Sequence, residues 1–238
     1  MIRMRGVKKA FGSRAALVGL DLDVSPGARI ALVGPNGSGK TTLIRCLLGA
    51  LAFEGSITVA GHDVVGDHAA ALTHVAYVPQ RAPRLTVPVR EVVRFWSKQR
   101  GLPADRLVAE AGRFGLDLDL LGPRTFDALS GGMQQKLLAC MALATECNVM
   151  VFDEPTANLD PASRAMFFEA LARRTPAPTV VLSSHRIEEI SGLVDRVVGL
   201  AEGAVAFDGG LEAFLANPEQ AAAAGIDIAN LVPFRRNA

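Results

Sequence analysis

The sequence lacks a charge imbalance, a cysteine framework and any long apolar run. Its 25 basic and 24 acidic side chains leave a formal net charge of +1, too weak a field to favour a nucleic acid or a membrane surface as partner. Cys46, Cys140 and Cys147 form no Cys-x-x-Cys pair, which excludes a disulfide framework and a zinc knuckle and favours a reducing compartment. No run reaches the roughly 20 apolar residues that cross a bilayer, and the N-terminus has no signal-peptide core. If the protein works at a membrane, we expect another chain to do the crossing.

The chain is long and apolar enough for a large core. It has 238 residues, of which 50% are hydrophobic, so one large domain or a core with an inserted subdomain can form. Short apolar or alternating stretches bounded by turn residues predict strands at 16–24, 29–33, 55–61 and 74–80. A helix is expected from residue 40 to a stop at Gly49.

The pattern becomes helical after residue 82 and then alternates again. Helices are predicted at 89–101, 104–115 and 130–146, the last capped by Ser130. Strands at 148–153 and 179–184, helices at 161–174 and 186–193 and a hairpin at 195–209 follow, an alternation that implies a parallel sheet. We therefore expect a core formed by 1–81 and 148–216, an inserted helical subdomain at 82–147, and a segment at 217–238 that is a helix, a tail or a contact segment.

One stretch matches the phosphate-binding pattern G-x-x-x-x-G-K-[ST] and lies between a predicted strand and a predicted helix. Backbone N–H groups of the loop and the helix N-terminus would cradle phosphates, Lys40 would reach the β and γ oxygens, and the Thr41 hydroxyl would bind Mg²⁺. A glycine-rich turn that binds nothing is the alternative, and the strand and helix around the motif disfavour it. The predicted phosphate loop comprises Gly34, Pro35, Asn36, Gly37, Ser38, Gly39, Lys40, Thr41 and Thr42.

Two adjacent carboxylates end the predicted strand at 148–153. Asp153 and Glu154 point in different directions if the strand continues to them, so they can take separate roles. Asp153 would hold Mg²⁺ through water, and Glu154 would polarise an attacking water. A solvated acidic pair at a strand end is an equally good reading of these two residues alone.

A second anion site is predicted where Ser130, Gly131 and Gly132 open a helix, because a hydroxyl and bare backbone amides face outward there. Two phosphate-binding ends would be redundant on one nucleotide within a monomer. If they lie on opposite faces, two copies of the chain must meet head to tail with ATP between them. We infer such a dimer.

With these motifs the sequence resembles the nucleotide-binding domain of ATP-binding cassette (ABC) proteins, from about residue 2 to residue 215. The phosphate loop is similar to the family's Walker A motif, 148–153 to Walker B, and 129–136 to the signature, with Met133 where Gln is commoner. Further positions resemble the family's adenine-stacking aromatic, Q-loop, D-loop and switch, namely Phe11 in place of the commoner Tyr, Gln80, Asp160 and His185. Singly, each of these could be a core residue or a polar strand end.

The resemblance implies an α/β fold: a P-loop NTPase core with an antiparallel β subdomain and an inserted α-helical subdomain. It implies ATP and Mg²⁺ as ligands and a homodimer with two sites. In each site Lys40, Thr41 and Asp153 of one chain would face Ser130 and Gly132 of the other. Gln80 would sense Mg²⁺ and the γ-phosphate, and His185 would contact the γ-phosphate.

The function implied by the resemblance is that of an ATPase subunit which drives a separate membrane permease from its cytoplasmic face. The stretch at 183–185 reads "SSH", where importers commonly have "TH", and this favours export over import. A soluble ABC ATPase acting on DNA or ribosomes is the alternative, but the long coiled-coil insertion, tandem cassette and basic surface of that class are missing, so no nucleic-acid partner is expected. A metal site at His62, His68 and His74 is disfavoured against a solvated surface.

Overall fold

The computed structural model describes residues 1–184 and 191–223. Its contacts divide the chain into two compact units, one of residues 1–74 with the described residues after 178, and one of residues 75–178. The division expected at residues 82 and 147 stays a prediction. Within the described ranges, every helix is too short or too polar to cross a membrane.

The first unit contains a four-stranded antiparallel sheet in the order β2-β1-β4-β5. Its interior strands are β1, which pairs with β2 and β4, and β4, which pairs with β1 and β5. Ile2, Met4 and Val7 of β1 are buried, and the register shifts between Met4 and Val7. The strands are β1 (Ile2–Phe11), β2 (Arg14–Val24), β4 (Glu54–Val59) and β5 (His62–Asp63).

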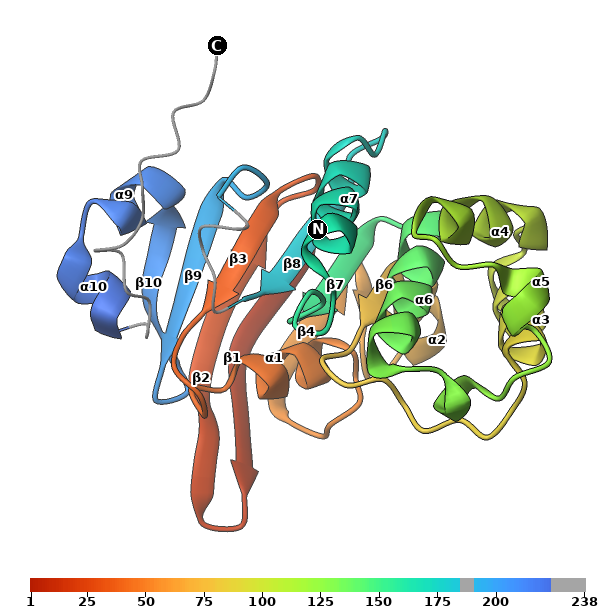
Figure 1. Ribbon diagram of the computed structural model, residues 1–238. Coiled ribbons are helices and arrows are strands. Elements are labelled where there is room, and N and C mark those ends of the chain that lie inside the picture. The colour runs from red at the N-terminus through yellow and green to blue at the C-terminus, as the bar shows by residue number, and fades with distance from the viewer. Residues whose placement is uncertain (185–190, 224–238) are drawn as a thin grey trace. The chain divides into compact units, whose positions relative to one another are not determined.

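Four further strands of the first unit lie in the order β10-β9-β3-β8, with β3 parallel to both of its neighbours and β9 and β10 forming an antiparallel hairpin (Figure 1). Residues 30–33 of β3 are buried, as expected for a parallel strand covered on both faces. These strands are β3 (Arg29–Val33), β8 (Thr179–Ser183), β9 (Arg196–Ala201) and β10 (Ala204–Gly210). The helices of this unit are α1 (Lys40–Leu47), α2 (His68–Thr73), α9 (Leu211–Leu215) and α10 (Pro218–Ala223).

The second unit combines a parallel strand pair with most of the helices. β6 (Val75–Val78) pairs with β7 (Val149–Asp153). The edge-to-face contact of Phe152 and Phe167, whose ring centroids are 5.0 Å apart, packs α7 against β7. α4 packs against α6, and α3 packs against α4 and α5. The helices are α3 (Val89–Arg100), α4 (Ala104–Arg113), α5 (Leu118–Leu121), α6 (Gly131–Ala144) and α7 (Pro161–Ala172), with a 3₁₀ turn η1 (Phe126–Ala128).

Most predicted elements are confirmed, including the three helices after residue 88, the buried strand before the two carboxylates and the hairpin of β9 and β10. The helix expected at 186–193 falls largely outside the described residues, and its last residues, 191–193, form a turn. The segment from residue 217 begins with α10, and residues 224–238 are not described.

Candidate functional site

The predicted phosphate loop follows β3 and leads directly into α1. Gly39 takes the N-cap position of α1 with φ 110°, and no side chain caps the helix, so its first N–H groups remain available to an anion. A Cβ on Gly39 would lie 2.7 Å from the carbonyl oxygen of Ala16, so only glycine fits this turn. Thr41 and Thr42 are half-buried in the first turn of α1.

Two buried polar groups of the loop show that its residues fit a phosphate. Lys40 is 6% exposed, and its ammonium donates to the carbonyl oxygens of Gly34, at 2.6 Å, and Pro35, at 3.1 Å. The Ser38 hydroxyl is buried and has no hydrogen-bond partner within the part of the chain that the structure describes. A buried polar group left without a partner costs about 1–3 kcal/mol, and a phosphate oxygen would accept from this hydroxyl.

The turn between β9 and β10 is hydrogen bonded to the phosphate loop. The N–H of Gly203 donates to the carbonyl oxygen of Ser38 at 3.1 Å, and the N–H of Val18 donates to the carbonyl oxygen of Gly203 at 3.1 Å. A Cβ on Gly203 would lie 2.6 Å from the carbonyl oxygen of Ala16. The sequence alone does not indicate a role for Gly203, because this residue lies in a hairpin far along the chain from the loop.

Phe11 lies at the end of β1, opposite Arg14 of β2. Its side chain is exposed, and the Lys9 ammonium lies 5.1 Å from its ring centroid. A Cβ on Gly37 would lie 3.3 Å from Arg14 Nη2, so the strand partner of Phe11 reaches the phosphate loop. Arg14 is therefore a cation beside the phosphate loop, and no sequence motif includes it.

The second unit brings together Gln80 and Glu154, which the sequence places far apart. Gln80 Nε2 donates to Glu154 Oε2 at 2.8 Å. Asp153 is 2% exposed at the end of β7, whereas Glu154 is half-buried, so the two carboxylates meet different surroundings. Glu154 has φ 48°, a left-handed backbone that costs a residue with a side chain about 1–3 kcal/mol and that concentrates at functional sites.

The N-terminus of α6 carries Ser130, Gly131 and Gly132. Ser130 Oγ accepts from the N–H of Met133 at 3.3 Å, the predicted cap. Ser130 and Gly131 are exposed, and a Cβ on Gly131 would meet nothing within 4 Å. This helix end is therefore open to solvent.

Asp160 joins the start of α7 to α6. The Lys136 ammonium lies 2.9 Å from its carboxylate, and Ser163 donates to it through both its N–H and its hydroxyl. These hydrogen bonds, that from Lys136 above all, hold the pKa of Asp160 well below its usual range. Lys136 lies in the stretch that resembles the signature, but the sequence alone indicates no role for it.

The predicted residues divide between the two units. Phe11 and the phosphate loop belong to the first, and Gln80, Asp153, Glu154, Ser130–Gly132 and Asp160 belong to the second. His185 lies outside the described residues. Of the three histidines weighed as a metal site, His62 lies 2.6 Å from Asp67 and stacks on His74, while His68 Nδ1 lies 3.0 Å from the carbonyl oxygen of Val64.

A glycine-rich loop that connects a buried parallel strand to a helix and encloses a lysine side chain defines a P-loop nucleotide-binding fold. The chain belongs to the ABC transporter family, as a nucleotide-binding domain: the family model described as "ABC transporter" matches residues 17–157, more than half of the chain.

Relatives agree with this membership. The chain is 33% identical to the Nod factor export ATP-binding protein I of Bradyrhizobium diazoefficiens over 90% of the chain and 72% of that protein. It is 38% identical to the phosphonates import ATP-binding protein PhnC of Anaeromyxobacter dehalogenans over 87% of the chain and 45% of that protein. It is 37% identical to ATP-binding cassette sub-family A member 7 of Rattus norvegicus over 86% of the chain, but it spans only 10% of that relative.

Solved structures share the fold. A structure of an ATP binding subunit of an ABC transporter superimposes with a TM-score of 0.84 at 23% identity, covering 97% of each chain. A dimeric structure of a post-hydrolysis state of an ATP-binding cassette, bound to ADP and Pi, gives a TM-score of 0.77 at 22% identity over 89% of this chain and 99% of that one. The predicted α/β P-loop NTPase fold is confirmed.

Proposed function

We propose that this chain hydrolyses ATP as the ATPase subunit of an ABC transporter. The observation that carries the proposal is the phosphate loop, where the buried Lys40 and the Ser38 hydroxyl, which has no partner among the described residues, would both donate to phosphate oxygens. The names of the relatives, which are ATP-binding proteins of transport systems, support the same activity.

The phosphate loop is the proposed binding half of the site. The N–H groups from Gly34 to Thr42 and the Lys40 ammonium would hold the β- and γ-phosphates, and Phe11 would stack on the adenine. Such stacking is typically worth about 1–3 kcal/mol. The Thr41 hydroxyl, the Asp153 carboxylate and the Gln80 amide would supply the oxygen ligands that Mg²⁺ prefers. When bound, Mg²⁺ neutralises charge that builds up on the phosphates.

Glu154 is the proposed general base. Its carboxylate would accept a proton from the attacking water, and the 2.8 Å hydrogen bond from Gln80 would orient that carboxylate. Since Gln80 precedes the helical segments of the second unit, a movement of those segments would alter the position of the base. His185 is proposed to contact the γ-phosphate.

The other half of each site is proposed to come from a second copy of the chain. Ser130 and Gly132 of that copy would bind the γ-phosphate of an ATP held by the first, and Gly131 and Asp160 would lie beside them. The exposure of the α6 N-terminus supports this, and so does the related cassette whose structure is dimeric. Phosphoryl transfer depends mainly on positioning and charge neutralisation, so dimer closure would switch catalysis on.

The proposed partner is a transmembrane permease, with the dimer on the cytoplasmic face of the membrane. Export is favoured over import because the sequence reads Ser183-Ser184 before His185, and because the chain covers 72% of a relative named for export against 45% of one named for import. Hydrolysis would reopen the dimer and thereby move the permease.

Phosphate release from MgATP by the purified chain tests the activity. We expect turnover in the wild type and a loss of about a hundredfold or more in Lys40→Ala, because one cation that stabilises the transferring phosphoryl group is removed. Equal turnover in the two proteins would contradict the assignment of the phosphate loop.

A further inference from the structure

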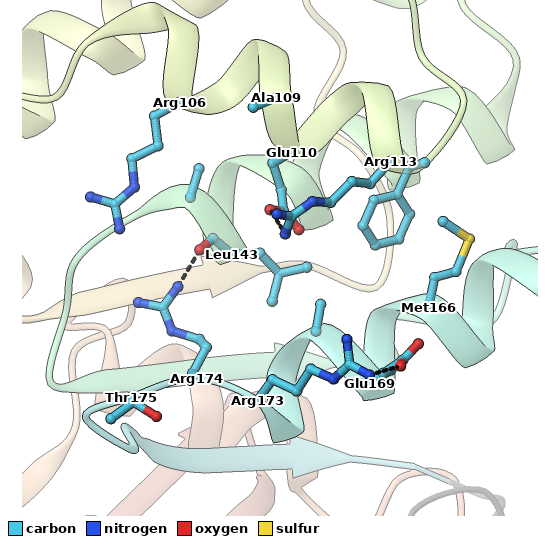
Figure 2. Close-up of a pocket in the computed structure, with 13 residues that line it drawn as sticks. Arg106, Ala109, Glu110, Arg113, Leu143, Met166, Glu169, Arg173, Arg174 and Thr175 are labelled. Atoms are coloured by element: carbon cyan, nitrogen blue, oxygen red, sulfur yellow. Dashed lines mark hydrogen bonds and ion pairs between the residues drawn. The ribbon is translucent and has the colours of Figure 1, made fainter.

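A basic cavity lies wholly within the second unit, formed by α4, the end of α6 and the end of α7. Its volume is about 770 Å³, and Figure 2 shows its charged side chains converging on a common space. The charged lining residues are Arg106, Glu110, Arg113, Glu169, Arg173 and Arg174, which leave a formal surplus of two positive charges. None of them belongs to the proposed ATP site.

The arginines of this cavity are not equally neutralised. Glu169 pairs with Arg173 at 2.6 Å, Glu110 pairs with Arg113 at 3.2 Å, and Arg106 pairs with Glu146. In contrast, no carboxylate in residues 1–184 and 191–223 lies within ion-pair distance of Arg174. Its Nη atoms donate instead to the carbonyl oxygens at the end of α6, those of Leu143 and Thr145.

Two buried polar atoms of the wall retain unused hydrogen-bonding capacity. In the described part of the chain, Arg174 Nε has no acceptor and Glu110 Oε1 has no donor. Burial is the main cause that lowers the pKa of Arg174, and the nearby charge of Arg106 lowers it further, while Glu110 and Glu146 oppose the shift. Without a directly paired carboxylate among the described residues, the cation is only partly compensated, so an anion beside it is favoured.

We propose that this cavity binds a phosphorylated polyol. Phosphate accepts paired hydrogen bonds from the planar fork of an arginine, which matches Arg174 with Arg106 and Arg113 nearby. A hydroxyl of the same ligand would donate to Glu110, and the carbon chain would lie against Phe114 and Leu143. The site is separate from the phosphate loop and does not depend on ATP hydrolysis.

The chain contains its own reporter of this site. Trp96 is the single tryptophan, it is buried, and its Nε1 donates at 3.1 Å to the hydroxyl of Thr145. The carbonyl oxygen of Thr145 accepts from Arg174 at 2.8 Å. An anion that accepts hydrogen bonds from Arg174 should therefore change the fluorescence of Trp96.

The test is a titration of the full chain with glycerol 3-phosphate, followed by Trp96 fluorescence, with glycerol as the uncharged probe. We expect a saturable change with glycerol 3-phosphate alone, which persists in Lys40→Ala. The double variant Arg106→Gln, Arg113→Gln should raise the Kd about tenfold or more, the usual effect of losing charged hydrogen bonds. Arg94→Gln, an exposed change of the same charge on α3 and outside this cavity, should bind as the wild type does.

Three results would overturn the proposal. The first is the lack of a saturable change at millimolar glycerol 3-phosphate. The second is unchanged affinity in the double variant. The third is loss of the response in Lys40→Ala, which would place the anion in the phosphate loop.

Discussion

The chain has two glycine-rich helix starts, and they differ in enclosure. At α1, Gly34 and residues 38–40 are buried while residues 35–37 are exposed, Gly39 provides no side-chain cap, and the side chains of Lys40 and Ser38 are enclosed. At α6 the Ser130 side chain caps its own helix, and Ser130 and Gly131 are exposed. The first start is shaped to hold an anion by itself. The second offers less surface to an anion, and we propose that it binds one only with a second surface against it.

This difference supports a composite site in which one chain holds ATP and another completes the surroundings of its γ-phosphate. The proposed catalytic and dimer-contact residues of the second unit are also held separately from one another. Glu154 and Gln80 are hydrogen bonded to one another, and Asp160 is fixed by Lys136 and Ser163. We infer that binding and turnover can be separated by mutation.

Glu154→Gln should give the largest separation between ATP binding and turnover. The amide keeps the shape of the carboxylate but cannot take a proton, so turnover should fall about a hundredfold to ten-thousandfold while ATP still binds. The ATP-bound variant should elute as a dimer from size exclusion. Turnover equal to that of the wild type would remove Glu154 from the role of base.

Ser130→Arg should come next, because it changes the open helix start and leaves the enclosed one intact. The bulky cation would block the approach of a second chain, so the affinity of the monomer for ATP should hardly change while ATP-dependent dimerisation and turnover are lost. Equilibrium binding of a fluorescent ATP analogue and size exclusion measure the two effects. A variant that still dimerises with ATP would refute the composite site.

Gly203→Ala should have a smaller effect on turnover, and this effect should be confined to the phosphate loop at the start of α1. The new methyl group would meet the carbonyl oxygen of Ala16 and disturb the hydrogen bond to Ser38, so the KM for ATP should rise several-fold. Gly61→Ala is the matched control, since Gly61 also has positive φ but has open space around it. Both changes carry a backbone cost of about 1–2 kcal/mol, and only the first should alter KM. Equal effects on KM would show that the hairpin does not position the loop.

Lys136→Met should have the smallest effect. Without the ammonium, the pKa of Asp160 should rise toward its ordinary value, which an NMR titration of the carboxyl carbon would measure. A carboxylate with a lowered folded pKa adds stability above its unfolded pKa, and this is lost as the pH falls through the folded pKa. The variant should therefore have a lower Tm near neutral pH and approach the wild type in strong acid. Lys98→Met, an exposed change on α3, should leave the Asp160 titration unaltered.

The contiguous features of the fold and site could be predicted from the sequence. The phosphate loop, the buried strand before Asp153 and the cap at Ser130 each depend on neighbouring residues, so a local pattern reveals them. The sequence does not predict β1 as a strand, because the register shift between Met4 and Val7 breaks the alternation of buried and exposed residues. The contacts of Gly203 with Ser38 and of Gln80 with Glu154 join distant segments, and no local pattern contains them.

The central claim is that one ATP is shared by two chains, and mixing two inactive variants tests it most directly. Lys40→Ala removes the cation of the helix start at α1, and Ser130→Ala removes the hydroxyl of the helix start at α6 without adding bulk that would block a second chain, so a mixed dimer contains one site with both halves intact. We predict that the mixture regains ATPase activity that neither variant has alone. If each chain completed its own site, the mixture would stay as inactive as its components, and the account would be contradicted.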